Sequence, residues 1–181
     1  DYFKNQLKKA CKKDTIQLMI FKTKSPKETQ EIASLLVKKN LKDKITRGGL
    51  VVALEGELGA GKTVFTQGFA RALKIKAKIK SPTFVLMRHY RITDFGLRIK
   101  TGLRIKKQSA ISNFYHLDCY RLRNYKDLLP LGIANILKDP ANIILIEWAE
   151  RVKPILPKNS IRVHIDHIGP KERKITITNF K

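Results

Sequence analysis

The sequence predicts an α/β fold, because apolar runs typical of buried strands alternate with a glycine-rich turn and helical patterns. Leu50–Leu54 (LVVAL) and Ile143–Ile146 are apolar at every position, as expected for strands buried on both faces of a sheet. The first run leads into Gly56–Thr63 (GELGAGKT), which fits the pattern G-x-x-x-x-G-K-[ST], and a helix is expected over Lys62–Leu73. Strand, glycine-rich turn and helix in this order are the setting in which such a turn binds phosphate.

The segment before this unit is expected to contain a basic extension and one helix. Residues 1–22 form the extension, whose lysine-rich first 15 residues lack a hydrophobic pattern and are expected to be a frayed arm or a short helix. Ser25-Pro26-Lys27-Glu28 fits a capping box with proline at the first helical position. A helix is therefore predicted from Pro26 to about Asn40. Its packed face is formed by Ile32, Leu35, Leu36 and Val37.

Two more strands are predicted directly after the unit, over Thr83–Tyr90 and Asn113–Asp118. Between them lies a basic insertion at about residues 91–112. It repeats GLRIK within Gly96–Lys107 and is expected to be an extended hairpin or loop. Two copies are too few for a solenoid of stacked repeats.

The C-terminal third is expected to add short helices and a hairpin. Residues 125–138 are expected to form short helices interrupted at Pro130 and Gly132. Alternating apolar residues predict strands over Ile161–Ile168 and Lys174–Asn179, joined by the turn at residues 169–171. No domain boundary is evident, so residues 23–181 are expected to form a single domain.

The composition indicates a globular protein that does not cross a membrane. Of 181 residues, 43% are apolar and 8% aromatic, which is too apolar for a disordered chain. No apolar run approaches the roughly 20 residues of a membrane helix. Ile16–Phe21 is too short for a signal-peptide core, so a cytoplasmic location is expected. Cys11 and Cys119 lack metal-ligand spacing, and two reduced thiols are favoured over a disulfide.

The charge is strongly positive, with 38 Lys and Arg against 15 Asp and Glu and a net charge of +23. Such an excess attracts polyanions and makes contact with RNA a reasonable interpretation. A compositional bias toward lysine, spread over a solvated surface, explains the charge equally well. The densest block is Lys74–Lys107, which contains Asp94 as its one acid.

The glycine-rich turn supplies the chemistry of a phosphate site. Gly56, Gly59 and Gly61 allow the backbone to bend so that its N–H groups converge on phosphate oxygens. Lys62 can bridge the terminal phosphates, and the Thr63 hydroxyl can ligate Mg²⁺. A glycine-rich turn without a ligand is the weaker alternative.

Two acids end apolar segments and are candidates for the magnesium shell and for orienting water. Glu147 follows Ile143–Ile146, in the place where P-loop enzymes carry an acid that supports the metal. A structural ion pair with Arg or Lys is its alternative. Asp118 closes the strand within Tyr115–Leu122 (YHLDCYRL), where it could orient water or reach the metal shell, or else cap a turn. Thr83, in Ser81-Pro82-Thr83, could place a hydroxyl near the terminal phosphate or simply start a strand.

Four motifs in order resemble the TsaE (YjeE) family, small bacterial P-loop ATPases of the tRNA threonylcarbamoyladenosine pathway. They are GELGAGKT, KSPTFVL (Lys80–Leu86), YHLDCYRL and ILIEW (Ile144–Trp148). The resemblance covers about Thr23 to Arg173. It implies a P-loop NTPase-like domain whose central sheet is mostly parallel, is flanked by helices and carries antiparallel hairpin additions.

The resemblance also implies a site for ATP and Mg²⁺. Thr63 and Glu147 would ligate the metal. The catalytic residues would be Lys62, Thr83, Asp118 and Glu147. The nucleotide-binding residues would be Ser25, Glu57, Leu58, Gly59, Ala60, Gly61, Lys62, Thr63, Val64, Trp148 and Arg173. The chain departs from the family in Cys119, which replaces a usual leucine, and in the long basic insertion.

The function implied is a weak, partner-dependent ATPase required for forming the threonylcarbamoyl group on adenosine 37 of tRNA. Members of the family do not transfer the group; they bind the TsaD/TsaB-type transferase complex and are thought to reset it by ATP hydrolysis. Contact with tRNA through the basic surface is a further expectation. Two alternatives stay open: a P-loop kinase for a small metabolite, with Arg91, Arg98 and Arg104 as a lid, and a basic RNA-binding assembly protein with a vestigial nucleotide site.

Overall fold

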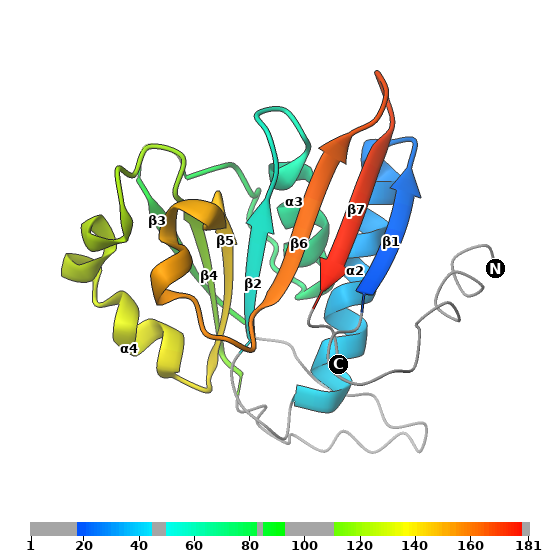
Figure 1. Ribbon diagram of the computed structural model, residues 1–181. Coiled ribbons are helices and arrows are strands. Elements are labelled where there is room, and N and C mark those ends of the chain that lie inside the picture. The colour runs from blue at the N-terminus through cyan, green and yellow to red at the C-terminus, as the bar shows by residue number, and fades with distance from the viewer. Residues whose placement is uncertain (1–17, 45–49, 83–84, 93–110, 179–181) are drawn as a thin grey trace, which may run out of the picture.

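The chain forms a seven-stranded sheet of order β1-β7-β6-β2-β5-β4-β3 (Figure 1). The computed structural model describes residues 18–44, 50–82, 85–92 and 111–178. The strands are β1 (Leu18–Thr23), β2 (Leu50–Glu55), β3 (Met87–Arg91), β4 (Asn113–Asp118), β5 (Asn142–Glu147), β6 (Ile161–His167) and β7 (Arg173–Thr178). The four central strands β6, β2, β5 and β4 are parallel, and β3, β7 and β1 are antiparallel to their neighbours. The expected α/β fold with a mostly parallel centre is therefore confirmed.

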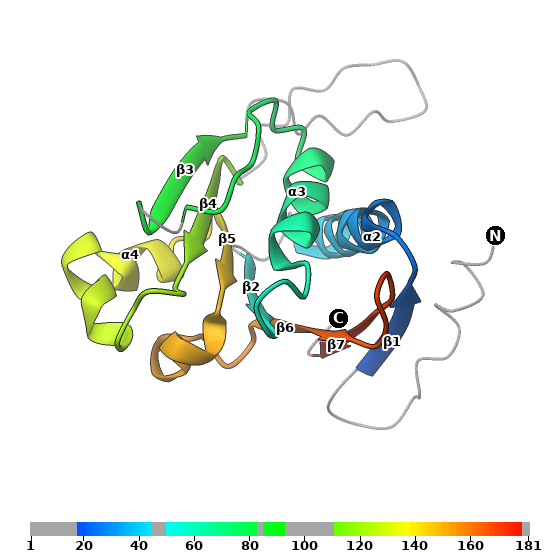
Figure 2. The same cartoon turned by 90° about the horizontal axis from the view of Figure 1, so that it is seen from above.

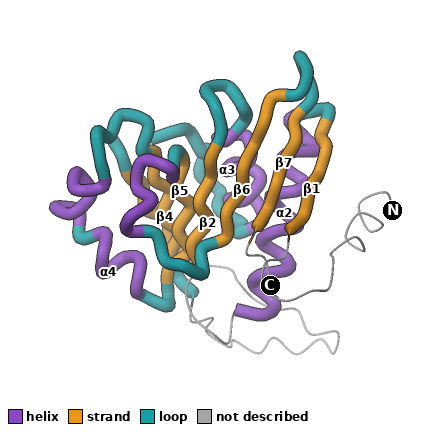
Figure 3. The backbone as a smooth tube through the Cα atoms, viewed as in Figure 1, coloured by secondary structure: helices purple, strands orange, loops and turns teal. Residues whose placement is uncertain are grey.

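Helices cover the sheet from two sides (Figure 2). On one side lie α2 (Pro26–Lys44) and α3 (Lys62–Ala72), which pack on a large apolar core. On the other side lie α4 (Ile133–Lys138) and the 3₁₀ helices η2 (Tyr125–Leu131) and η3 (Ala149–Ile155), over a second core beneath β2, β4 and β5. Figure 3 shows that these short helices gather over the β4–β5 half of the sheet. No helix within the described ranges has the length and apolarity needed to span a membrane.

The two fully apolar runs occupy the middle of the sheet, as their sequences predict. All six residues of β5 are buried, and so are the first five of β2. Ser25 caps the helix as expected, since the Glu28 N–H donates to Ser25 Oγ at 3.2 Å, but Glu28 Oε2 accepts from the Lys24 N–H at 2.8 Å instead of the Ser25 N–H of a capping box. The helix that it starts runs past the expected end at Asn40 to Lys44.

The edge strand β1 was not among the predicted elements. It pairs with β7 over Leu18–Thr23, and its residues alternate between exposed and buried. Met19 and Phe21 are buried, whereas Leu18 and Ile20 on the other side are 48% and 51% exposed. Because both sides are apolar, the alternation is hidden in the sequence. The expected division between residues 22 and 23 cuts through this strand.

The predicted strand over Thr83–Tyr90 is wrong at its start, because β3 begins at Met87. The N–H groups of Val85 and Leu86 both donate to the Pro82 carbonyl, and Leu86 has a φ of 68°, so the chain turns there. Thr83 itself lies outside the described residues, as do the basic insertion from residue 93 to 110 and the N-terminal residues 1–17.

The close crossing of α2 and α3 makes Gly68 a position of large expected effect. A Cβ added at Gly68 would lie 2.4 Å from both the Cα and the carbonyl oxygen of Gln30. Alanine normally favours a helix over glycine by about 1 kcal/mol. We nevertheless expect Gly68→Ala to lower the free energy of unfolding by about 1–3 kcal/mol in urea titrations, because the obstacle is backbone that has to move. Arg71→Ala on the exposed side of α3 is the control. A Gly68→Ala variant as stable as wild type would contradict the close approach of Gly68 to the Gln30 backbone.

Candidate functional site

Three parallel strands end together at the edge of the sheet that carries the glycine-rich turn. The turn follows β2, and Glu147 at the end of β5 is in register with Leu54 of β2 and with Asp118 of β4. Register partners on adjacent strands present their side chains on the same face of a sheet. The two acids from distant parts of the sequence are thus neighbours, on the face that α3 covers.

The backbone of the turn needs glycine where it passes β6. Gly56, Gly59 and Gly61 all have positive φ, at 135°, 76° and 105°. A Cβ at Gly56 would lie 2.3 Å from the carbonyl oxygen of Ile165 in β6, so a side chain cannot be accommodated there. The turn is thereby held against β6, directly before the start of α3.

Lys62, the first residue of α3, has its ammonium group enclosed by its own turn and by Trp148. Its Nζ donates to the carbonyl oxygens of Gly56 at 2.6 Å and Glu57 at 2.9 Å, and lies 3.6 Å from the centre of the Trp148 ring. Only 5% of the residue is exposed. Burial lowers the pKa of Lys62 below its ordinary value, and the negative charges of Glu147, Glu150 and Asp118 oppose that shift.

Glu147 links β5 to α3 through both of its carboxylate oxygens. Oε2 accepts from the Thr63 hydroxyl at 3.0 Å, and Oε1 lies 2.9 Å from Thr66 Oγ1 and 2.8 Å from His116 Nε2. Within the described part of the chain, its close ionisable partner is His116 rather than an Arg or Lys. Among the described residues, Glu147 therefore does not form the structural ion pair with Arg or Lys that was its alternative role.

The same oxygens fit a magnesium ion. Mg²⁺ takes hard oxygen ligands and is usually held by one or two carboxylates together with phosphates and water. The Thr63 hydroxyl and Glu147 Oε2, 3.0 Å apart, are such a pair beside the turn. No cluster of three or more His, Cys, Asp or Glu ligands occurs among the described residues.

His116 is buried behind Glu147 and is expected to position it. A carboxylate only accepts hydrogen bonds, so His116 Nε2 carries the proton of the 2.8 Å contact. Nδ1 is buried without a hydrogen-bond partner among the described residues. Among the residues that the structure describes, one polar contact therefore holds the side chain, the one to Glu147.

Removal of that contact should loosen Glu147. We expect His116→Phe to lower the free energy of unfolding by about 1–3 kcal/mol, because Glu147 loses a buried donor. If the chain hydrolyses ATP, as the sequence predicts, the variant should also need more Mg²⁺ for half-maximal hydrolysis. His116→Gln can still donate and should restore part of the magnesium dependence. A phenylalanine variant with an unchanged magnesium requirement would show that His116 does not orient the carboxylate.

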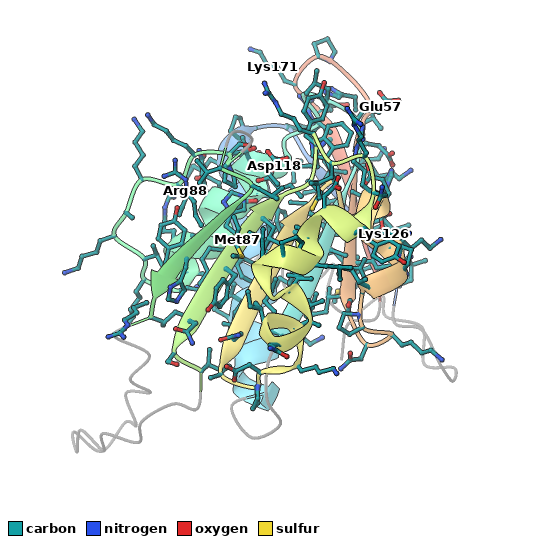
Figure 4. All side chains as sticks on the ribbon, turned by 90° about the vertical axis from the view of Figure 1, so that its left-hand side faces the viewer. Glu57, Met87, Arg88, Asp118, Lys126 and Lys171 are labelled. Carbon is teal, nitrogen blue, oxygen red and sulfur yellow. The ribbon has the colours of Figure 1, made fainter. Side chains whose placement is uncertain are left out.

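Asp118 lies at the end of β4 with both oxygens engaged. Oδ2 accepts from the Ser81 hydroxyl, and Oδ1 accepts from the Tyr120 N–H at 3.0 Å. Figure 4 shows Asp118 toward the same end of the molecule as Glu57 of the turn. The sequence motif Ser81-Pro82-Thr83 thus reaches the site through its serine, whereas Thr83 is outside the described residues.

A cluster of aromatic and cationic side chains borders the Lys62 side of the site. Of its members, the sequence predicts only Trp148. Tyr120 and Trp148 have ring centres 4.9 Å apart, and the Arg151 guanidinium lies 5.9 Å from each ring. Trp148 has a left-handed backbone with φ 59° and precedes η3. This turn brings the indole over Lys62.

The other residues that were predicted to bind a nucleotide have different surroundings. Arg173 donates from Nε to the Ala60 carbonyl at 3.0 Å, so it joins the β6–β7 hairpin to the turn. Ser25 caps α2, and its described contacts are with residues of that helix. Glu57 and Leu58 at the tip of the turn are exposed, and Val64 on α3 is half-buried.

Cys119 is a free, fully buried thiol beside the site. Burial raises its pKa to about 12, with Asp118 and Glu150 adding to the shift and Arg151 opposing it. A raised folded-state pKa gives stability that is present below the ordinary thiol value and is lost as the pH rises toward the folded value. Between pH 8 and pH 10 the free energy of unfolding of wild type should therefore fall by about 1 kcal/mol relative to Cys119→Ala. Equal pH profiles in urea titrations would contradict the shift.

The chain is similar in sequence and in fold to proteins of one family. The family model described as threonylcarbamoyl adenosine biosynthesis protein TsaE matches residues 23–175. A Bacillus subtilis protein named tRNA threonylcarbamoyladenosine biosynthesis protein TsaE is 32% identical over 158 residues, covering 87% of this chain and 84% of that protein. A Treponema pallidum protein of the same name is 33% identical over 131 residues, covering 71% of this chain and 82% of the relative. The crystal structure of Bacillus subtilis YdiB is similar with a TM-score of 0.60 and 27% identity, covering 93% of this chain and 90% of the other.

Proposed function

The chain belongs to the TsaE family of threonylcarbamoyl adenosine biosynthesis proteins, and on that premise we propose that it is a magnesium-dependent ATPase. Its hydrolysis of ATP resets the TsaD/TsaB-type complex that transfers the threonylcarbamoyl group to adenosine 37 of tRNA. It acts in the cytoplasm, where it binds that complex rather than carrying out the transfer itself.

The observation that carries this proposal is the contact between Thr63 and Glu147. A hydroxyl at the start of α3 and a carboxylate at the end of β5 meet at 3.0 Å, beside the turn that would hold phosphates. This is the pair that P-loop enzymes use to hold the metal bound to a nucleoside triphosphate. A glycine-rich turn without a nucleotide role would not need a buried acid aimed at its threonine.

The roles of the side chains follow from their positions. The N–H groups of the turn and the Lys62 ammonium bind the phosphate oxygens, for which Lys62 exchanges its contacts with Gly56 and Glu57. Thr63 and Glu147 would hold Mg²⁺, which when bound neutralises charge on the β- and γ-phosphates. Asp118, fixed by Ser81 and the Tyr120 N–H, orients the attacking water.

Partner dependence also has a basis in the local contacts. Lys62 donates to two carbonyl oxygens of its own turn, and these bonds compete with phosphate. A bound transferase complex that favours the phosphate-binding position of Lys62 would raise the rate. We therefore expect slow hydrolysis by the chain alone and faster hydrolysis with the complex.

Reconstitution tests the proposal. The chain is combined with the transferase complex, its substrates and tRNA, and modified adenosine is measured by mass spectrometry with ATP or with a non-hydrolysable analogue. Repeated rounds of modification are expected only with ATP. Equal yields with the analogue would contradict a resetting role, and efficient transfer of the γ-phosphate to a metabolite would favour a kinase instead.

A further inference from the structure

A segment of the sequence without acids leads directly to the candidate site. From Arg71 to Ile92 the sequence contains seven Lys and Arg residues and no Asp or Glu. Four of them, Lys74, Lys76, Lys78 and Lys80, alternate along the segment between α3 and β3, and we name these four the basic row. All four are exposed, and none forms an ion pair with a carboxylate of the described residues.

The basic row is held in place by the residues between its lysines. Ile79 is 5% exposed, and Ile75 packs against the same core. The Ile75 N–H donates to the Ala70 carbonyl at 3.1 Å, and Gln67 Nε2 donates to the Ile79 carbonyl at 3.2 Å. The lysines are therefore presented from an anchored backbone, in an alternation that directs them away from the core.

The chemistry of this surface fits a polyanion better than a protein. Protein–protein interfaces are depleted in lysine at their centre, whereas nucleic-acid interfaces are polar and strongly positive. Lysine that neutralises phosphates releases counterions, which supplies affinity without base recognition. On β3, next along the chain, Arg88 adds an exposed cation, and Figure 4 shows it on the same side of the molecule as Asp118.

We propose that the basic row binds the phosphate backbone of tRNA. The proposal rests on the proposed function only in naming tRNA as the RNA. Ser81 directly follows the row and donates to Asp118, so RNA bound there lies beside the nucleotide site. The bound tRNA would thereby be adjacent to the residues that act on ATP.

The test compares two variants of equal charge. One carries Lys74→Gln, Lys76→Gln, Lys78→Gln and Lys80→Gln; the control carries glutamine at Lys27, Lys138, Lys153 and Lys158, which are exposed elsewhere. Binding of a tRNA transcript to the full chain is measured by fluorescence anisotropy at several salt concentrations. The row variant should bind at least about tenfold more weakly at low salt, and its log–log salt slope should fall by about 3. The control should stay within about twofold of wild type.

Three binding outcomes would overturn the proposal. Equal losses in both variants would assign binding to net charge, and no loss in either would remove the row from RNA contact. If the row variant keeps tRNA but loses the purified transferase complex, the row binds an acidic protein. Basal ATP hydrolysis by the row variant should stay within about twofold of wild type. A failure of ATP hydrolysis in wild type would sink the ATPase proposal and leave the tRNA result standing.

Discussion

Lys62→Ala is expected to lower ATP hydrolysis by about 10²- to 10³-fold, the usual loss when one preorganised charged or hydrogen-bonding group is removed from a transition state. The ammonium lies against the turn with two hydrogen bonds to its carbonyls, and it would exchange these bonds for contacts with the phosphate oxygens that the turn would bind. Release of phosphate from ATP, with and without the transferase complex, measures the rate. Trp148 is the chain's one tryptophan and lies 3.6 Å from Lys62 Nζ, so its fluorescence reports nucleotide binding separately.

The control for this variant is Lys126→Ala, which removes an exposed lysine and should leave the rate unchanged. The free energy of unfolding should also depend on pH differently in wild type and in Lys62→Ala. Because the pKa of Lys62 is lowered on folding, the unfolded chain binds more protons near the ordinary lysine value, and wild type should gain stability relative to Lys62→Ala as the pH rises toward that value. An alanine variant that hydrolyses ATP at the wild-type rate would leave Lys62 without its proposed role.

The centre of the fold could be predicted because its residues are apolar on both faces. Leu50–Leu54 and Ile143–Ile146 needed no knowledge of their neighbours to be identified as buried strands. The turn and the start of α3 followed from glycine spacing, which is a local property. The helix was expected to end at Leu73 and ends at Ala72.

The edge strands are harder to predict from the sequence, because they depend on pairing between distant segments. β1 is a strand because β7 pairs with it and α2 covers one of its faces, neither of which residues 18–23 reveal by themselves. β3 starts late because Leu86 adopts a left-handed backbone, an unusual conformation for a leucine. A β-propensity pattern through Val85 and Leu86 could not anticipate it.

The sequence predicts the two acids of the candidate site, but it does not predict the residues that hold Glu147 in place. Glu147 and Asp118 are predictable from the sequence because each ends an apolar segment. Thr66 lies one helical turn beyond Thr63, so a pattern of hydroxyls three apart on a helix could have indicated it. The contact of His116 with Glu147 depends on which strands are neighbours, and that order is not written in either segment.

Glu147→Gln is the second substitution of large expected effect, because it removes the carboxylate charge while keeping the shape of the side chain. We expect magnesium-dependent hydrolysis to fall by about 10²- to 10³-fold, equivalent to several kcal/mol of metal-assisted stabilisation. The amide oxygen can still accept from Thr63 or Thr66, so the free energy of unfolding should change by no more than about 1 kcal/mol. Trp148 fluorescence should show ATP binding that Mg²⁺ strengthens in wild type and leaves nearly unchanged in the variant.

Glu150→Gln is the control that shows whether Glu147 acts as a metal ligand or only through its negative charge near Lys62. Glu150 is exposed, follows the same strand and also contributes negative charge at Lys62, but its described contacts do not include Thr63. If both glutamine variants lose hydrolysis equally, the loss comes from charge around Lys62. If Glu147→Gln alone loses both hydrolysis and the magnesium effect on ATP binding, the loss comes from the oxygen that faces Thr63. Only that second pattern agrees with an acid at the end of β5 sharing one cation with the threonine at the start of α3.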